Sequence, residues 1–250
     1  RSISARADRQ TFASSDLARL SLATDAIAKG GHAQVPVLLE GETPSLFNSL
    51  IFASLRAWAL FGEGRPGEGQ LALLDATSGD RYLDSLILNM LAIMEVSSGE
   101  DASALETFGK IDESGTITAV STDIYARLLA ASGEREKAVT VLERFRKEAG
   151  PNPLLQDLAA RIEAGEPVEA RRLDARQGAA LSVYMPAAAL ASQSQTDLPG
   201  VYYAIALRLD PNLHAARSLW ADALDTAGRS TESIDLRVQR MLGVVCNRVS

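Results

Sequence analysis

The chain has 250 residues, of which 46% are hydrophobic, 23% charged and 5% aromatic, which is too apolar for an intrinsically disordered protein and sufficient for a sizeable core. Its formal net charge of -7 and its pI of about 5.0 disfavour nucleic acid as a partner, because an acidic surface repels phosphate. A single cysteine, Cys246, excludes an internal disulfide. A membrane-spanning helix needs about 20 consecutive apolar residues, and the sequence contains no such run.

Apolar residues recur at helical spacing along the chain, and much of the apolar content is alanine and leucine, which favour helices. These features predict an all-α fold. Pro44 and Pro66 suit the first turn of a helix, and Asp101 and Glu134 suit the positive end of a helix dipole. The β-branched run 115–122 could be extended, but its phase favours helix or loop. In chain order, we expect helices at 14–29, 33–40, 45–61, 67–75, 82–97, 101–111, 118–131, 135–149, 154–164, 179–192, 197–209, 214–227 and 230–242.

Small residues that would turn the chain between two helices recur with a fixed period. Consecutive turn glycines are separated by 34, 35, 34 and 95 residues, and the last interval divides into 61 and 34 residues if Ser194 occupies the same position. A period of about 34 residues is typical of repeated helical hairpins. The turn positions are Gly30, Gly64, Gly99, Gly133, Ser194 and Gly228.

A second regularity lies seven residues before each turn, where every copy has alanine. A small side chain is needed where the two helices of a hairpin cross closely. The column therefore predicts about six helical hairpins that share one packing geometry. Its members are Ala23, Ala57, Ala92, Ala126, Ala187 and Ala221.

The long interval of 61 residues indicates a spacer, which we place at 150–178. A Gly-Pro-Asn-Pro sequence opens it, one short helix is expected at 154–164, and Gly165 and Pro167 end that helix. The spacer is a candidate hinge. The predicted blocks are 1–149 with four repeats, 150–178, and 179–250 with two repeats and a tail.

These patterns resemble those of tetratricopeptide repeat (TPR) proteins, over about residues 14–242. The resemblance is carried by the period, the alanine column and the segment DPNLHAARSLWADALDTAGRSTESI. The order of segments such as LRAWALFGEGRPGEGQLALLD, GPNPLLQDLAARIEAG and YYAIALRLDP is similar to that of a family of large exported proteobacterial TPR proteins of unsettled role. The resemblance implies a right-handed α-solenoid, export and protein binding without catalysis. Pro186, inside an expected helix, and Ser194, at a turn, depart from the repeat pattern.

No combination of residues in the sequence predicts catalysis, a cofactor or a metal site. His32 and His214 lack the spacing of metal ligands, and Cys246 has no neighbouring base. The G-x-G-x-x-G match at 62–67 follows an expected helix rather than a strand, so we interpret it as an interhelical turn. Basic residues in the spacer stand among acidic residues without aromatics, so for Arg171, Arg172 and Arg176 we expect intramolecular ion pairs or a capped linker rather than an RNA contact.

In TPR arrays the first helix of each hairpin lines a concave face, and this resemblance projects a groove on the chain. Tryptophan and arginine are frequent interface anchors. Trp58 is equally compatible with packing against a neighbouring helix of its own chain. The projected groove residues are Trp58, Phe61, Asn89, Asp123, Arg127 and Tyr184.

We therefore expect a non-enzymatic scaffold that binds a protein or peptide segment on its concave face, without nucleic acid, cofactor or membrane insertion. The alternative is a structural module that self-associates through exposed repeat ends. A more remote alternative is an enzyme whose site is assembled from several repeats. A periplasmic or exported location follows from the resemblance alone, and a cytoplasmic one is also compatible with the sequence.

Overall fold

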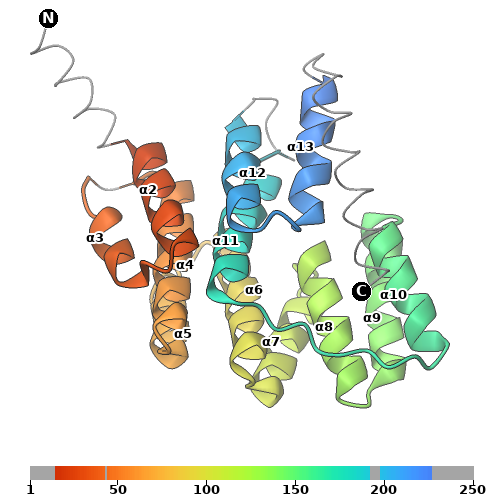
Figure 1. Ribbon diagram of the computed structural model, residues 1–250. Helices are drawn as coiled ribbons and strands as arrows, with labels where there is room; N and C mark the ends of the chain where they lie inside the picture. The colour runs from red at the N-terminus through yellow and green to blue at the C-terminus, as the bar shows by residue number, and fades with distance from the viewer. Residues whose placement is uncertain (1–14, 43, 192–197, 227–250) are drawn as a thin grey trace, which may run out of the picture. The chain divides into compact units, whose positions relative to one another are not determined.

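The computed structural model describes residues 15–42, 44–191 and 198–226, and helices dominate this part of the chain (Figure 1). The described residues form twelve α-helices and one short 3-10 helix, with no strand. The predicted all-α fold is therefore confirmed. None of the described helices combines the length and apolarity that crossing a bilayer requires. The expected turn at Ser194 and helix at 230–242 lie outside the described residues.

Contacts divide the chain into two compact units. Unit 1 joins both ends of the chain, residues 1–69 and 175–250, whereas unit 2 is continuous from 70 to 174. The predicted blocks 1–149, 150–178 and 179–250 do not contain this pairing of the two ends. Each unit has its own core and is described separately.

Unit 1 contains helices from both ends of the chain. Its elements are α2 (Asp16–Ala28), η1 (His32–Gln34), α3 (Val35–Leu38), α4 (Leu46–Gly62), α11 (Ala175–Ala191), α12 (Leu198–Leu209) and α13 (His214–Thr226), and α5 (Pro66–Leu74) begins in it. Helix α11 packs against α4 and α12, and α12 also packs against α2 and α13. The single helix expected at 33–40 is instead η1 followed by the one-turn helix α3, with Pro36 in its first turn.

In the core of unit 1, an aromatic ring from the segment before unit 2 packs directly against a glycine from the segment after it. Trp58 of α4 is fully buried, and a Cβ atom added to Gly178 of α11 would lie 2.2 Å from its ring. Only glycine therefore allows the two helices to approach this closely. Phe61 adds a tilted ring 5.0 Å from Trp58, between ring centroids.

A buried polar network also connects the two ends of unit 1. The guanidinium of Arg19 pairs with Asp16 at 2.5 Å and lies over the ring of Phe52, 5.2 Å from its centroid. The other carboxylate oxygen of Asp16 accepts a hydrogen bond from the Asn48 amide at 2.8 Å, and Asn48 Oδ1 accepts one from the Tyr202 hydroxyl at 3.0 Å. Helices α2, α4 and α12 are thus joined by hydrogen bonds between side chains, although Arg19 Nε within the same network has no partner.

Unit 2 consists of antiparallel helix pairs followed by one further helix and an extended segment. Its helices are α6 (Arg81–Ser98), α7 (Asp101–Glu113), α8 (Ala119–Ala131), α9 (Arg135–Ala149) and α10 (Pro153–Glu163), and α5 ends in it. Helix α8 packs against α6, α7 and α9, and α10 packs against α8 and α9. The predicted helix of the spacer is therefore confirmed as α10.

The alanine column behaves as the packing argument requires. All six alanines are completely buried, in both units. In unit 2, Ala92 and Ala126 are the members of the column, and Ala104 and Ala138 on the second helices of the pairs are equally buried. Small side chains on both helices of a pair allow close approach of the backbones.

Six described helices end in the same glycine turn, and five of them are α2, α4, α6, α8 and α10; the sixth is α7, which ends at Gly115 with φ 69° and a hydrogen bond from Thr116 N–H to the Ile111 carbonyl at 3.3 Å. In each, the glycine has φ between 69° and 87°, a left-handed conformation that disfavours any side chain. The next residue donates its N–H to the carbonyl five positions back, as Glu100 does to Glu95 at 2.9 Å and Glu166 does to Arg161 at 3.0 Å. The turn glycines are Gly30, Gly64, Gly99, Gly115, Gly133 and Gly165. Helix α10 therefore ends as the first helix of each preceding pair does.

Candidate functional site

The projected groove residues are divided between the two units, three in each. In unit 1, Trp58 is fully buried and Tyr184 is nearly so, and Phe61 is half-buried. Burial raises the pKa of the Tyr184 hydroxyl above its ordinary value, and the Tyr184 ring lies 6.1 Å from that of Tyr203. In this conformation, Trp58 and Tyr184 serve the core of unit 1 and present no open face to a ligand.

In unit 2, Asn89 also has an internal role. It is fully buried, and its amide nitrogen donates to the Ser85 carbonyl at 2.7 Å and the Thr116 carbonyl at 3.2 Å. The second bond fixes the loop between α7 and α8. Asn89 therefore positions backbone and does not face a ligand.

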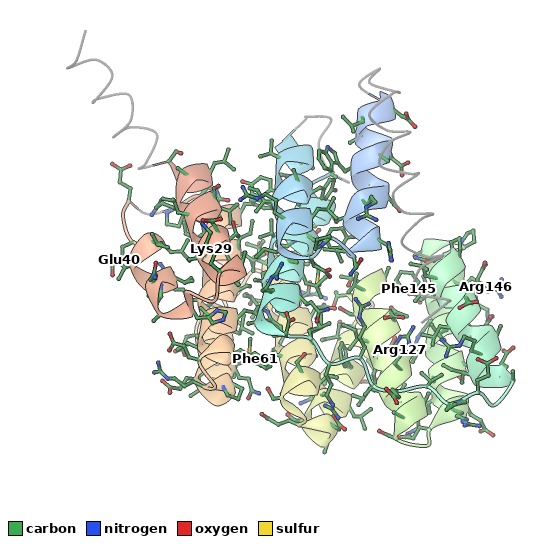
Figure 2. All side chains as sticks on the ribbon, viewed as in Figure 1. Lys29, Glu40, Phe61, Arg127, Phe145 and Arg146 are labelled. Atoms are coloured by element: carbon green, nitrogen blue, oxygen red, sulfur yellow. The ribbon has the colours of Figure 1, made fainter. Side chains whose placement is uncertain are left out.

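Asp123 and Arg127 are the two projected residues of unit 2 that the structure brings together. They lie one turn apart on the outward face of α8, where Arg127 Nε donates to Asp123 Oδ1 at 2.9 Å. Their side chains retain 15% and 27% exposure, and Arg127 is labelled in Figure 2. This face of α8 is partly open and charged, as expected of a recognition surface.

An extended segment of the chain crosses this face. Residues 166–174, which we call the strap, contain no helix and run from the end of α10 across the front of α8 in Figure 1. Its second residue, Pro167, has a fixed φ and no N–H to donate. The strap is therefore an extended peptide held by other elements of unit 2 rather than by its own hydrogen bonds.

Ion pairs hold the strap to two helices. Arg171 Nη1 lies 3.2 Å from Asp123 Oδ2, which places Asp123 between two guanidinium groups. Arg172 makes two parallel hydrogen bonds of 2.9 Å to the Asp101 carboxylate at the start of α7, a geometry that favours arginine over lysine. Hydrogen bonding to Asp101 raises the pKa of Arg172 above its ordinary value.

The end of α6 provides the remaining contacts. Arg172 also donates to the Val96 carbonyl, where the negative end of the α6 dipole favours a cation. The N–H of Leu173 donates to Ser97 Oγ at 3.1 Å, and the Leu173 side chain is buried between exposed neighbours on either side. The site therefore offers carboxylate, carbonyl and hydroxyl acceptors together with one apolar position.

The sequence predicted part of this arrangement. Intramolecular ion pairs from Arg171 and Arg172 are confirmed, but their partners are 48 and 71 residues earlier in the chain rather than in the spacer. The strap's path over α8 was not predicted. The sequence signal that could have suggested it is the near-alternation of apolar Val168, Ala170 and Leu173 with charged residues, which is typical of an extended segment on a surface.

The contacts at the strap are ion pairs and hydrogen bonds. Within the described ranges, no group of three or more His, Cys, Asp or Glu side chains is arranged to hold a metal ion. The charged groups of the site are already joined in pairs, which suits binding to a complementary segment. Comparison of the chain with protein-family models, curated proteins and solved structures finds no match of any of the three kinds.

Proposed function

We propose that this chain is a non-enzymatic scaffold, a right-handed α-solenoid of TPR-like hairpins, that binds an extended segment of a partner protein on the face of unit 2 formed by α6, α7 and α8. The observation that carries the proposal is the strap itself. An extended peptide with two arginines and a leucine already lies on this face, held by Asp101, Asp123 and Ser97. The face therefore has the acceptors that such a peptide requires.

The repeat architecture is supported by several independent regularities. The first helices of the successive pairs end in the same glycine turn, and the alanine at the crossing point is buried in all six copies. In unit 2, each new pair packs on the preceding one, since α8 contacts both α6 and α7. Stacked hairpins of this kind present a continuous row of first helices, the surface that repeat proteins use for binding.

The chemistry of the face indicates the class of partner. Its two carboxylates select adjacent cations, and the buried position of Leu173 selects an apolar residue directly after them. A partner segment with two basic residues followed by an aliphatic residue would reproduce these contacts. Such a segment would have to displace the strap. Its apparent affinity is therefore its intrinsic affinity multiplied by the fraction of molecules in which the strap has left this face.

The proposal is tested with a labelled peptide that carries the strap sequence EPVEARRLDAR. We expect weak binding to the unmodified chain and tighter binding when Arg171→Ala and Arg172→Ala loosen the internal strap. Asp101→Asn with Asp123→Asn should abolish peptide binding in either background. The control is Asp157→Asn, an exposed change on α10. Binding that survives loss of both carboxylates would contradict the proposed function.

A further inference from the structure

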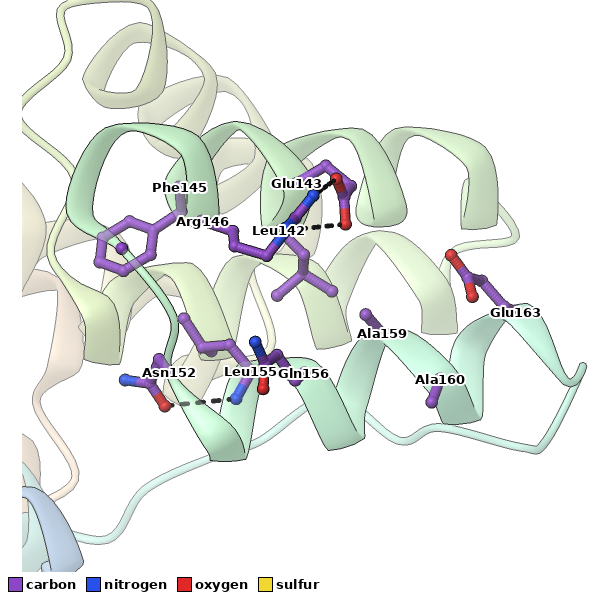
Figure 3. A pocket seen from close by; sticks show the side chains of 11 residues that line it. Leu142, Glu143, Phe145, Arg146, Asn152, Leu155, Gln156, Ala159, Ala160 and Glu163 are labelled. Atoms are coloured by element: carbon purple, nitrogen blue, oxygen red, sulfur yellow. Dashed lines mark hydrogen bonds and ion pairs between the residues drawn. The ribbon is translucent and has the colours of Figure 1, made fainter.

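A second surface of unit 2 lies between α9 and α10, away from the contacts of the strap. The two helices enclose an open groove of about 270 Å³, shown in Figure 3. Small-molecule pockets usually have roughly 300–1,000 Å³ and enclose their ligand, so this shape is better suited to one face of a helix. Its lining residues are Leu142, Glu143, Phe145, Arg146, Gly150, Asn152, Leu155, Gln156, Ala159, Ala160 and Glu163.

Helix α10 has the features of a first helix that lacks its second. It packs on both helices of the preceding pair, α8 and α9, as α8 packs on α6 and α7, and it ends at Gly165 in the turn that also follows α4, α6, α7 and α8. After Gly64, Gly99 and Gly133, a helix begins two residues later, whereas the chain after Gly165 continues as the strap. The position where a second helix would pack against α10 and α9 is the groove.

The chain's own sequence after Gly165 does not suit this position. Nine residues after the turn, second helices have the large buried side chains Phe108 and Leu142, but the strap has Asp174, which is exposed. Eleven residues after the turn, α9 has Arg144, which pairs with Asp112 on α7. Arg176 is the residue eleven positions after Gly165. The residue of α9 that is equivalent to Asp112 of α7, thirteen positions after the turn, is Arg146. In a second helix built from the chain's own sequence, Arg176 would therefore face a like charge.

The surface of α9 also differs from the equivalent surface of α7 in its exposure. Ile111 on α7 is buried, whereas Phe145, its equivalent on α9, is only half-buried. Arg146 is 49% exposed and is held by two hydrogen bonds from its guanidinium to Glu143, at 3.2 and 2.7 Å. An apolar ring beside a positioned cation is thus available on the groove wall.

We propose that this groove binds one amphipathic α-helix of a partner protein, in the position of the missing second helix. The partner helix presents a large apolar side chain to Leu142 and Phe145, and a carboxylate to Arg146. Ala159 and Ala160, two small residues of α10 among those that line the groove, allow the close approach of a helix backbone. This surface is separate from the strap face, so the inference does not depend on the proposed function.

The test uses a helix-stabilised, fluorescent peptide copied from α9, residues 134–149, with Arg144→Glu to match Arg146. Its mismatched counterpart retains Arg144. With the full chain, we expect the matched peptide to bind roughly three- to tenfold more tightly than its counterpart, as measured by fluorescence anisotropy. Arg146→Glu in the chain should reverse this preference, which a merely structural role of Arg146 would not do.

A steric variant tests the groove independently of charge. Ala160→Trp places a large ring at an exposed groove position, and we expect it to weaken binding of the matched peptide by more than about tenfold. Leu154→Trp is the control, because Leu154 is an exposed residue of α10 that does not line the groove. Equal affinity for both peptides, or equal binding by both tryptophan variants, would overturn the proposal. Dimerisation that is abolished by Ala160→Trp alone would also overturn it, in favour of a second copy of the chain.

Discussion

At the scale of single residues, the two described segments of unit 1, one before and one after unit 2 in the sequence, meet through contacts that sequence spacing could not place. The sequence left Trp58 open between a groove and internal packing, because helical phase gives the face of a residue but not what covers that face. The structure covers it with Gly178, which is 120 positions away in the chain numbering. The same reasoning holds for Tyr184 and Asn89, whose burial depends on neighbours from other helices.

The contact between Trp58 and Gly178 predicts a large effect from the smallest substitution. Gly178→Ala puts a methyl group where the Trp58 ring already lies, 2.2 Å from the added atom, and should destabilise unit 1 by about 1–3 kcal/mol or more through overpacking. Chemical denaturation followed by circular dichroism measures this change. The control is Gly67→Ala on α5, where an added Cβ meets nothing within 4 Å, and equal stability of the two variants would contradict the packing argument.

Asp16 predicts a pH dependence of the stability of unit 1. Burial raises the pKa of Asp16, but hydrogen bonds from Asn48, the Ser45 amide and Arg19 outweigh it, so the net pKa lies below the ordinary 3.8. A carboxylate with a lowered folded-state pKa stabilises the fold above its unfolded pKa, and this contribution is lost as the pH falls through the folded value. The free energy of unfolding should therefore decrease as the pH falls below about 4.

The Asp16→Asn variant checks the origin of that pH dependence. Its unfolding free energy should change less between about pH 5 and pH 3 than that of the unmodified chain, because the titrating group has been removed. Glu148→Gln, at an exposed position of α9, is the matched control. If both variants keep the full pH dependence, Asp16 is not its source.

At the scale of elements, the helices were predictable and the strap was not. Helix positions follow from local signals such as the prolines of first turns, the turn glycines and the apolar period, and every described helix has a predicted counterpart. Pro167 of the strap lies two residues after a turn glycine, as does Pro66, which begins α5. Its extended form depends on Asp101, Asp123 and Ser97, which belong to other helices. Local sequence cannot express that dependence.

The hydroxyl group of Tyr202, which joins α12 to α4, should make a measurable contribution to the stability of unit 1. Tyr202→Phe removes the donor to Asn48 Oδ1 and leaves a buried acceptor without its partner, which costs about 1–3 kcal/mol. The Tyr202 ring should still make its edge-to-face contact with Phe47, at 5.2 Å between centroids. Tyr82→Phe makes the same chemical change at a side chain with 46% exposure and should be nearly neutral, so similar thermal denaturation midpoints would argue against the buried bond.

At the scale of the whole molecule, the order of helices along the chain and their grouping in space differ. The repeat period follows the chain, and it predicts neighbours in sequence. The contacts of unit 1 instead join α2 and α4 to α11 and α12, although all of the residues of unit 2 lie between these two groups of helices in the sequence. Pairing of the chain ends depends on surface complementarity, as between Trp58 and Gly178, and neither period nor composition contains that information.

The continuity of unit 2 and the discontinuity of unit 1 predict different behaviour in fragments. Residues 66–174 contain all of α5, every helix of unit 2 and the strap, so this fragment should unfold cooperatively on heating. Residues 15–65 contain α2, α3 and α4 but lack α11 and α12. In the structure, α11 covers Trp58, and Tyr202 of α12 donates a hydrogen bond to Asn48. That fragment exposes a large apolar surface and should lack cooperative unfolding by circular dichroism until residues 175–226 are added.

Complementation in solution distinguishes this division from a simple linear array. In a linear array, neighbouring repeats stabilise one another, so residues 15–65 should gain as much from fusion to unit 2 as from the C-terminal helices. In the structure, Gly178 and Tyr202 complete the core of α2 and α4, so the gain should come from residues 175–226 alone. Gly178→Ala in the added fragment should weaken complementation, because the rescue then depends on the same contact that joins the chain ends.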